Sequence, residues 1–420
     1  MRILVLGTNY TPEVTGVAPF TAGLAEHLTD TGNEVTVATS FPHYPQWRTQ
    51  PPYVGLWRAF ERVGEVNVRR SRVFLPSRPG LLGRIAYDSS IAAGGLLNGV
   101  GARADLVICV TPPIQLAIVA GVLARAWRTP YILLVEDLAV RAALSVGLMR
   151  SRWIEALAKR LERTAYNLAD RIVVISQGFA DSLVHGGVRS DRLRLIPHWA
   201  HGDAVERQAD VAIRREMGAT EGDLLVMYAG NLGQKQGLID ALRAASLGAD
   251  HNVFKLVLIG DGSERRTLER TIEEGAIRNA RVLPLQPEWR LRSMLAAADV
   301  FLLTQRADVI DSVAPSKLLT YFSAGRPVLA AVHSASEAAR LVNESRGGVI
   351  VTPESPEALL EAIEGMARSG AKRGEFGKAG RLFAQSRFTR DRVLAQWDDL
   401  IAETMNSGVY RRTSVGRARR

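Results

Sequence analysis

Two consecutive series of short apolar runs, each run separated from the next by a helical pattern, constrain the fold of this chain more than any other feature. Continuous apolar runs rich in β-branched residues are typical of parallel strands that helices cover on both faces. The sequence therefore predicts an α/β fold with two Rossmann-like, doubly wound domains in tandem. The first series is RILVLG, EVTVATS, DLVICV, YILLVE, RIVVIS and LRLIP, and the second is LLVMYAG, FKLVLIG, ARVLPL, DVFLLT, RPVLAA and GGVIV.

A polar stretch, HWAHGDAVERQAD at residues 198–210, separates the two series. A chain of 420 residues is also long enough to form two cores. We expect an N-terminal domain over residues 1–200 and a C-terminal domain over residues 201–388. The basic end of the chain, residues 409–420, is expected to be a disordered tail whose arginines are either solvated or in contact with anionic lipid headgroups.

The charge and cysteine content favour an ordinary cytoplasmic protein. The chain carries 53 basic and 43 acidic residues, but five arginines lie in its last ten residues. The folded body is therefore only mildly basic, and nucleic acid is not an expected partner. Cys109 is the only cysteine, which excludes an intrachain disulfide and favours a reducing compartment. The first residues lack the long apolar core and the cleavage site of a signal peptide.

One uncharged segment, Leu106–Ala124, is nearly long enough to cross a bilayer. Pro112 and Pro113 lie in its middle, and adjacent prolines interrupt a helix. The segment is therefore predicted to form a buried strand, a turn and a buried helix.

Several common catalytic motifs are absent. No GxGxxG follows the first strand, since Gly7 and Gly16 lie nine residues apart, and this weakens the case for a dinucleotide-dependent oxidoreductase. The sequence has no Walker motif, no HExxH and no paired CxxC, so it predicts neither phosphate-loop hydrolysis nor a protein-bound metal. Ligands of open α/β sheets bind outside the carboxyl ends of the strands, so we expect the site in loops after strands, in a cleft between the domains.

Two glycine-containing loops suit a phosphate or sugar ligand. In the loop 7–20, Gly16 would allow close backbone approach, and the following helix offers free N–H groups; the alternative is an ordinary turn. In the loop 228–238, Gly230 and Gly233 bracket Asn231, and Lys235 precedes a helix. A cation there would suit a diphosphate leaving group. The alternative is that Lys235 is an ordinary solvated lysine.

Two further loops follow strands of the second series. In LIGDGSE, Gly260 and Gly262 form a turn that either shapes a nucleotide pocket or only connects a strand to a helix. In VAPSK, Ser316 is a plausible N-cap, and Lys317 lies in the first turn of a helix. A lysine in a first turn opposes the helix dipole unless an anion is bound, which favours a phosphate site over an exposed lysine.

An acidic pair follows the strand YILLVE in the first domain. Glu136 and Asp137 would accept hydrogen bonds from an acceptor sugar or orient its hydroxyl. The alternative is a salt bridge to Arg141, one helical turn later.

Two stretches combine aromatic and basic residues and suit a bilayer interface. The stretch 44–74, expected as a loop and helix, either contacts a membrane and a lipid diphosphate or is an ordinary packed helix. The stretch 150–171 has an apolar stripe and a basic opposite face, and we favour a core helix over a second membrane contact. The residues concerned are Trp47, Arg48, Tyr53, Trp57, Arg58, Phe60, Arg62, Arg69, Arg70 and Arg72 in the first stretch, and Trp153, Leu157, Leu161 and Leu168 in the second.

The loops, taken in order, resemble those of the retaining glycosyltransferases of family four, which have the GT-B fold of two Rossmann-like domains facing across a cleft. The resemblance runs along almost the whole chain and is nearest to a bacterial branch of colanic acid and O-antigen fucosyl- or N-acetylfucosaminyltransferases. The segments on which the resemblance rests include YTPEVTGVAPFTAGLAEHLTDTGNEVTVAT, VVISQGFADSLVHGGV, YAGNLGQKQGL, LVLIGDGSE, AAADVFLLT and PSKLLTYFSAGRPVLA.

The sequence departs from the broad family at its usual charged positions. Two glutamates of the family fall on Ser312 and Thr320, and its arginine and lysine of the second-domain loop fall on Asn231 and Gln236. A histidine often found in the first domain falls on Glu136. GNLGQKQGL with PSKLL is the habitual form of the branch, so we interpret these differences as substitution rather than loss.

The resemblance implies roles for the remaining residues. Asn231, Lys235, Ser316 and Lys317 would line the nucleotide diphosphate, and Thr320 would face the ribose. Lys235 and Lys317 would meet the leaving-group charge, so no metal and no cofactor other than the nucleotide diphosphate sugar is needed.

The resemblance also implies an acceptor, a location and a course for the chain. The acceptor would be a polyprenyl-diphosphate-linked glycan of surface polysaccharide assembly, at the inner face of the inner membrane. A helix at about 389–408 would cross back to the first domain. Two alternatives stay open at this point: a nucleotide-sugar 2-epimerase on the same fold, and a non-catalytic subunit that binds a partner transferase.

Overall fold

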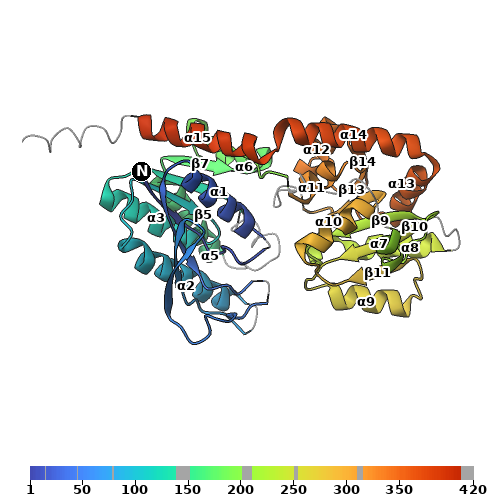
Figure 1. Ribbon diagram of the computed structural model, residues 1–420, viewed down its shortest axis with the longest axis horizontal. Coiled ribbons are helices and arrows are strands. Elements are labelled where there is room, and N and C mark those ends of the chain that lie inside the picture. The colour runs from blue at the N-terminus through green and yellow to red at the C-terminus, as the bar shows by residue number, and fades with distance from the viewer. Residues whose placement is uncertain are drawn as a thin grey trace, which may run out of the picture. The chain divides into compact units, whose positions relative to one another are not determined.

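The chain folds into two compact units, Met1–Pro197 with Leu394–Arg420, and His198–Val393. The computed structural model describes residues 1–14, 16–44, 46–77, 80–138, 152–200, 211–249, 254–309 and 316–407. Figure 1 shows strands and helices alternating along the chain within each unit. None of the described helices is long and apolar enough to cross a membrane.

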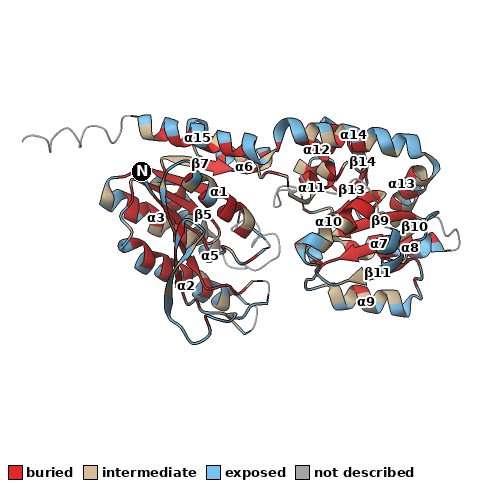
Figure 2. Cartoon of the chain, viewed as in Figure 1, coloured by how far each residue is buried: buried red, intermediate tan, exposed pale blue. Residues whose placement is uncertain are grey.

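The first unit contains an eight-stranded sheet in the order β3-β4-β2-β1-β5-β6-β7-β8. Neighbouring strands are parallel except β3 and β4, which form an antiparallel hairpin at one edge. The central strands are buried along almost their whole length, as expected for strands covered on both faces (Figure 2). The strands are β1 (Arg2–Leu6), β2 (Glu34–Ser40), β3 (Arg58–Val63), β4 (Val66–Ser71), β5 (Leu106–Val110), β6 (Tyr131–Val135), β7 (Arg171–Val174) and β8 (Leu193–Leu195), and the helices are α1 (Ala18–Asp30), α2 (Leu81–Val100), α3 (Ile114–Trp127), α5 (Arg152–Leu168) and α6 (Gln177–His185).

The second unit contains a six-stranded parallel sheet in the order β11-β10-β9-β12-β13-β14. Alternate residues of β9 enter two different hydrophobic clusters, Leu225 and Met227 in one and Val226 and Tyr228 in the other. Successive side chains of a strand point to opposite faces, so each face of the sheet carries its own core. The elements are β9 (Leu224–Ala229), β10 (Phe254–Ile259), β11 (Ala280–Leu283), β12 (Val300–Thr304), β13 (Val328–Ala331), β14 (Gly348–Val351), α7 (Val211–Glu216), α8 (Leu238–Leu247), α9 (Arg265–Glu274), α10 (Glu288–Ala297), α11 (Ser316–Ala324), α12 (Glu337–Ser345), α13 (Pro356–Arg368) and α14 (Gly370–Arg387).

Both sheets reverse their strand order at one point. In the first sheet, β1 has β2 on one side and β5 on the other, and in the second sheet β9 lies between β10 and β12. The loops that leave the carboxyl ends of two such neighbouring strands turn to opposite faces and leave a crevice between them. The predicted doubly wound fold is confirmed, and the reversal points indicate where each unit would bind a ligand.

The last helix, α15 (Arg390–Asn406), begins in the second unit and belongs to the first from Leu394 onward. Within the first unit, Asp398 pairs with His27 at 2.9 Å, and Glu403 pairs with Arg171 at 3.3 Å. The first unit is therefore completed by residues from the far end of the chain.

The stretch 44–74 is not the loop and helix that the sequence suggests, because its second half forms the hairpin β3–β4. Arg58–Val63 alternates exposed and half-buried residues with a period of two, which is the pattern of an edge strand. Gly64, with φ of 57°, forms the turn. A period-two pattern this short and this rich in charged residues cannot be distinguished from part of a charged helix by sequence alone.

The other two ambiguous segments resolve differently. Leu106–Ala124 forms β5, a turn and most of α3, as predicted. The stretch 150–171 does form a helix, α5, but only its C-terminal half packs against the core, where Ala165 and Tyr166 are buried. Trp153, in its first turn, is 69% exposed, so the interpretation as a core helix is wrong for that half.

Candidate active site

At the reversal point of the second sheet, two loops pack with their backbones in direct contact. Gly230 N donates to Ile259 O at 2.8 Å, and Leu232 N donates to Asp261 O at 2.8 Å. Gly260 has φ of 151°, and a Cβ added to it would lie 1.8 Å from Gly230 O. No other residue fits there, so Gly260 holds the loops after β9 and β10 together. The predicted turn thus shapes the edge of the sheet.

Lys317 lies in the first turn of α11 and reaches back to the end of β9. Its Nζ donates to the hydroxyl of Tyr228 and lies 4.2 Å from the centre of that ring. A Cβ added to Gly230 would lie 2.3 Å from Lys317 Cε, so the glycine makes room for the lysine. Within the described residues, Lys317 has no carboxylate at ion-pair distance.

The surroundings of Lys317 are electrostatically unusual. Burial lowers the pKa of Lys317 from its ordinary value of 10.5 to about 7, because an ammonium loses its hydration without gaining a negative partner. The first turn of a helix disfavours a cation further. An anion bound beside Lys317 would relieve both effects, so this position is a candidate anion site.

Helix α11 is fixed to the sheet by Tyr321. Its hydroxyl accepts a hydrogen bond from Ala229 N at 2.9 Å, and its ring stacks on Phe301 with the centres 4.2 Å apart. The described part of the helix starts at Ser316, directly after residues that lie outside the described ranges, so the N-cap role suggested by the sequence stays a prediction. Ser316 and Thr320 are half-buried on this helix, and Ser312 lies outside the described residues.

The loop after β9 presents the other predicted donor-side residues. Asn231 is exposed, and its backbone carbonyl accepts from the Tyr228 hydroxyl at 2.7 Å. Gly233 N donates to the Gln236 side chain at 3.1 Å. Lys235 is half-exposed in the short 3-10 turn Gln234–Gln236. Asn231 and Lys317 thus both contact Tyr228, a residue that sequence reasoning did not single out.

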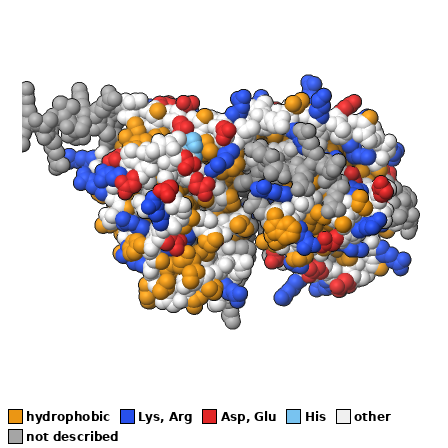
Figure 3. Space-filling view, viewed as in Figure 1, with side chains coloured by type: hydrophobic (Ala, Val, Ile, Leu, Met, Phe, Trp, Pro, Cys, Tyr) orange, Lys and Arg blue, Asp and Glu red, His pale blue; other side chains and the backbone are white. Residues whose placement is uncertain are grey.

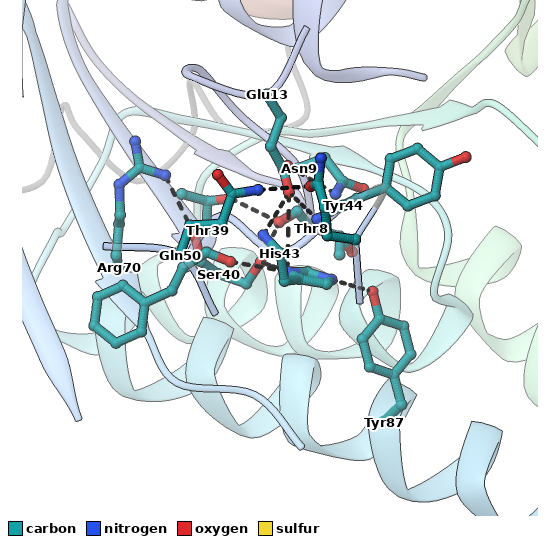
Figure 4. A network of polar contacts seen from close by, with 12 residues as sticks. Thr8, Asn9, Glu13, Thr39, Ser40, His43, Tyr44, Gln50, Arg70 and Tyr87 are labelled. Carbon is teal, nitrogen blue, oxygen red and sulfur yellow. Dashed lines mark hydrogen bonds and ion pairs between the residues drawn. The ribbon is translucent and has the colours of Figure 1, made fainter. Parts of the chain in front are cut away.

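In the first unit, a buried carboxylate ties together the loops after β1 and β2, and sequence reasoning missed it (Figure 4). One oxygen of Glu13 accepts the backbone N–H groups of His43 and Tyr44, both at 2.8 Å. The other accepts from the Asn9 side chain at 2.8 Å. A carboxylate held by three donors, with its side chain 2% exposed, is a fixed part of the loop structure.

His43 extends this network toward helix α2. Its Nε2 lies 2.8 Å from the Tyr87 hydroxyl, and its Nδ1 lies 2.8 Å from Phe41 O (Figure 4). Burial raises the pKa of Tyr87 well above its ordinary range. The Trp47 ring, half-exposed, lies 5.4 Å from the Tyr87 ring. The network thus ends at an aromatic side chain that solvent reaches.

Arg70 is a buried residue of this region and not an exposed cation. Its side chain is 1% exposed and pairs with Glu61 at 2.5 Å. It also donates to Ser40 O at 3.3 Å and to the backbone carbonyl of Thr11. Arg70, with the buried Tyr53 whose ring lies 5.4 Å away, is therefore excluded from the membrane-facing set that the sequence suggested.

The remaining predicted residues of the first unit lie at the carboxyl edge of its sheet. Gly16 has φ of 66°, and no protein atom would meet a Cβ added there. Glu136 and Asp137 follow β6 directly and are half-buried. Arg141, the alternative partner of this acidic pair, lies outside the described residues. In the parts of the chain that the structure describes, no three acidic, histidine or cysteine side chains gather as a metal site would require.

Solved structures with the same two-sheet architecture belong to the GT-B class of glycosyltransferases. The crystal structure of Anabaena Alr3699/HepE in complex with UDP is similar with a TM-score of 0.69 and 16% identity, over 96% of this chain and 100% of that one. WaaG, a glycosyltransferase involved in lipopolysaccharide biosynthesis, is similar with a TM-score of 0.68 and 17% identity, over 97% and 100%. The chain therefore has the GT-B fold.

Family models identify the chain more narrowly. Residues 15–199 match the Glycosyl transferase 4-like domain, and residues 211–383 match Glycosyl transferases group 1. The chain belongs to these group 1 glycosyltransferases and is a retaining enzyme of family four, as its motifs indicate.

Two curated glycosyltransferases are similar to the chain. The putative colanic acid biosynthesis glycosyl transferase WcaI of Escherichia coli is 28% identical over 94% of this chain and 98% of that protein. The probable glycosyltransferase WbjE of Pseudomonas aeruginosa is 27% identical over 62% of this chain and 66% of that protein.

Proposed function

We propose that the protein transfers a sugar, an N-acetylated or deoxy hexose, from a nucleotide diphosphate sugar to a polyprenyl-diphosphate-linked glycan at the inner membrane. The transfer would contribute to capsule, exopolysaccharide or O-antigen assembly. The similarity to WcaI, a putative colanic acid biosynthesis glycosyl transferase, supports the polysaccharide context. Family membership favours transfer over the 2-epimerase and over a non-catalytic subunit.

The observation that carries the donor half of the proposal is the position of Lys317. Its ammonium is held over Gly230 at the reversal point of the second sheet, in the first turn of α11. A diphosphate at that point would accept hydrogen bonds from the first N–H groups of the helix and from Lys317. Asn231 and Lys235 on the loop after β9, and Ser316 next to Lys317 on α11, would complete the contacts, and Thr320 would face the ribose.

This arrangement suits a leaving group that gains negative charge. As the bond between the anomeric carbon and the phosphate oxygen breaks, charge accumulates on the diphosphate, and helix N–H groups and lysines stabilise it. The acceptor hydroxyl attacks from the same face, its oxygen bonds to the anomeric carbon, and its proton passes to the departing phosphate oxygen. Retention then requires neither an enzyme nucleophile nor a metal.

The first unit would bind the acceptor. Glu136 and Asp137, which follow β6 at the carboxyl edge of its sheet, would orient the acceptor hydroxyl. Glu13 would act as a positioning residue, since it fixes the loops after β1 and β2 on the same edge.

Calorimetry with UDP, GDP, ADP and their monophosphates, with and without chelator, tests the donor half. We expect one diphosphate to bind much more tightly than its monophosphate, regardless of chelator, and Lys317→Ala to weaken that binding. Binding of none of these nucleotides would contradict the proposal. Transfer to a lipid-linked acceptor, against hydrolysis or epimerisation without acceptor, then tests the reaction itself.

A further inference from the structure

Helix α2 has an apolar face on each side, and only one of them is covered. Tyr87, Ile91 and Gly95 lie on the side that packs into the first unit. The opposite side carries apolar residues at helical spacing, and Leu82, at its start, is 82% exposed. Surface helices normally present charged residues to water. The exposed residues of this side are Leu82, Ile85, Ala86, Ser89, Ala93, Leu96, Leu97 and Val100.

The hairpin β3–β4 continues this apolar surface. Arg58 donates to Leu97 O at 3.2 Å, and Arg69 donates to Asn98 O at 3.1 Å, so the hairpin is tied to the C-terminal end of α2. Both guanidinium groups also lie over the ring of Phe60, at 5.0 and 5.8 Å. Phe60 is 64% exposed beside this junction. Trp57, 76% exposed, precedes the same strand.

Figure 3 shows hydrophobic side chains gathered over the region of α2 on this face of the molecule. The α2–hairpin surface is defined by the exposed side chains of Leu82, Ile85, Leu96, Leu97 and Val100 from the helix and Trp57 and Phe60 from the hairpin.

Charge around the α2–hairpin surface is positive. Residues 56–103 contain eight arginines against three acidic residues, and two of these acids are paired with the buried Arg70 and with Arg84. Arg62 pairs with Glu65, but Arg58, Arg69 and Arg72 have no carboxylate at ion-pair distance in the described part of the chain. Apolar side chains edged by arginines without a carboxylate partner match a bilayer interface, where the rings and leucines enter the acyl boundary and the guanidinium groups meet phosphates.

We propose that the α2–hairpin surface docks the protein on an anionic lipid bilayer, with α2 lying along the membrane plane. The proposal rests on the proposed function in that a lipid-linked acceptor requires access to the membrane. It replaces the wider membrane-facing stretch suggested by the sequence, because Tyr53 and Arg70 are buried while the outer face of α2 was not recognised. A second copy of the chain is the competing occupant of the same surface.

Vesicle flotation of the full chain tests the proposal. The probes are vesicles of phosphatidylcholine alone and vesicles containing about one-third phosphatidylglycerol. We expect binding to the anionic vesicles, weakened by high salt, and a loss of roughly tenfold or more for the double variant Leu82→Glu with Leu96→Glu. Leu382→Glu is the matched control, since Leu382 is 56% exposed in the second unit, and it should bind like the wild type.

A site-specific label provides an independent measurement. Because Cys109 is fully buried, a cysteine introduced by Leu82→Cys is the reactive thiol for an environment-sensitive fluorophore. Its emission should shift to the blue on anionic vesicles, and a label at Leu382→Cys should not respond. Equal responses at both positions, or no response at position 82, would overturn the proposal.

Nucleotide binding separates the two hypotheses. The Leu82→Glu, Leu96→Glu variant should keep the calorimetric donor affinity of the wild type, since its substitutions lie on an exposed face of the first unit. Loss of vesicle binding with intact donor affinity supports the surface alone, whereas wild-type vesicle binding without any donor binding would retain the surface and remove the proposed function. A wild-type dimer in light scattering that the variant converts to monomer, with no vesicle binding, would assign the surface to self-association and overturn the docking proposal.

Discussion

Because the pKa of Lys317 lies near neutral pH, we predict that binding of the donor weakens as the pH rises. In the unliganded protein, burial lowers the pKa of Lys317 to about 7. A diphosphate beside it raises that pKa, so binding is coupled to protonation of the amine. Below about pH 7 the amine is already charged, and the affinity is at its plateau. Above that value each pH unit reduces the affinity roughly tenfold, or about 1.4 kcal/mol, as long as the pKa in the complex stays higher than the pH.

The assay is titration calorimetry with the cognate nucleotide sugar between about pH 6 and about pH 9. The intact nucleotide sugar is preferable to the free diphosphate, whose terminal phosphate titrates at about 6 and would add its own pH dependence. Repeating the titration at about pH 8 in buffers of different ionisation enthalpy should reveal uptake of about one proton per ligand bound.

Three variants isolate the responsible group. Lys317→Arg keeps the charge throughout this range and should remove the slope, whereas Lys317→Met should lower the affinity and also remove the slope. Lys378→Met alters an exposed lysine of α14 and should leave the slope unchanged. A wild-type affinity that is flat from about pH 6 to about pH 9, or a slope that survives in Lys317→Arg, would refute the reasoning.

The same lysine affects stability without ligand. A lysine whose folded pKa is depressed destabilises the protein most when the pH is below that pKa, and the penalty fades as the pH rises toward 10.5. Lys317→Met should therefore raise the melting temperature at about pH 7 and have less effect at about pH 10. An unchanged melting temperature at both pH values would show that the lysine is hydrated in the free protein.

Further predictions concern packing and buried charge. Gly260→Ala should destabilise the protein by about 3 kcal/mol in urea unfolding, because the added Cβ would lie 1.8 Å from the carbonyl oxygen of Gly230. The control is Gly222→Ala, where no atom lies within 4 Å of the added Cβ, and it should change the free energy of unfolding by less than about 0.5 kcal/mol. Similar losses of stability for both variants would contradict the packing argument. Glu61→Gln should lower the free energy of unfolding by about 2 kcal/mol or more, because it leaves the buried Arg70 without its carboxylate partner. Glu65→Gln removes only an exposed ion pair and should have no measurable effect. Equal thermal stability of the two variants would show that Arg70 does not need a negative partner.

The sequence was sufficient for the fold because parallel strands buried on both faces leave a strong local signal. Apart from Arg2 and Lys255, RILVLG and FKLVLIG are apolar, and both form interior strands of their sheets. The hairpin β3–β4 gave a weaker signal, since an edge strand is half solvated and Arg58–Val63 reads as a charged stretch. A strand buried on both faces can thus be recognised from its sequence, whereas the pairing of an edge strand cannot.

The candidate site was predicted only in part, for a related reason. Lys317 was recognisable from its place after a proline at a helix start, but its half-buried position over the Tyr228 ring depends on Tyr228 and Gly230 at the end of a distant strand. Glu13 is not recognisable as a site residue from the sequence, because a single glutamate between a proline and a valine gives no sign of burial. Its partners, His43 and Tyr44, are 30 and 31 residues further along the chain.

The division of α15 between the units has a consequence for synthesis of the chain. Domains generally fold in order as they leave the ribosome, at about 5–20 residues per second. The first unit emerges first, yet its final helix follows the whole of His198–Val393. Synthesis of the second unit takes roughly 10–40 seconds at this rate. During this time the surface around His27 and Arg171, which pairs with α15, stays uncovered. During that interval the nascent first unit is incomplete, so we expect it to depend on a chaperone. The second unit is continuous in sequence and does not depend on a later segment of the chain to complete it.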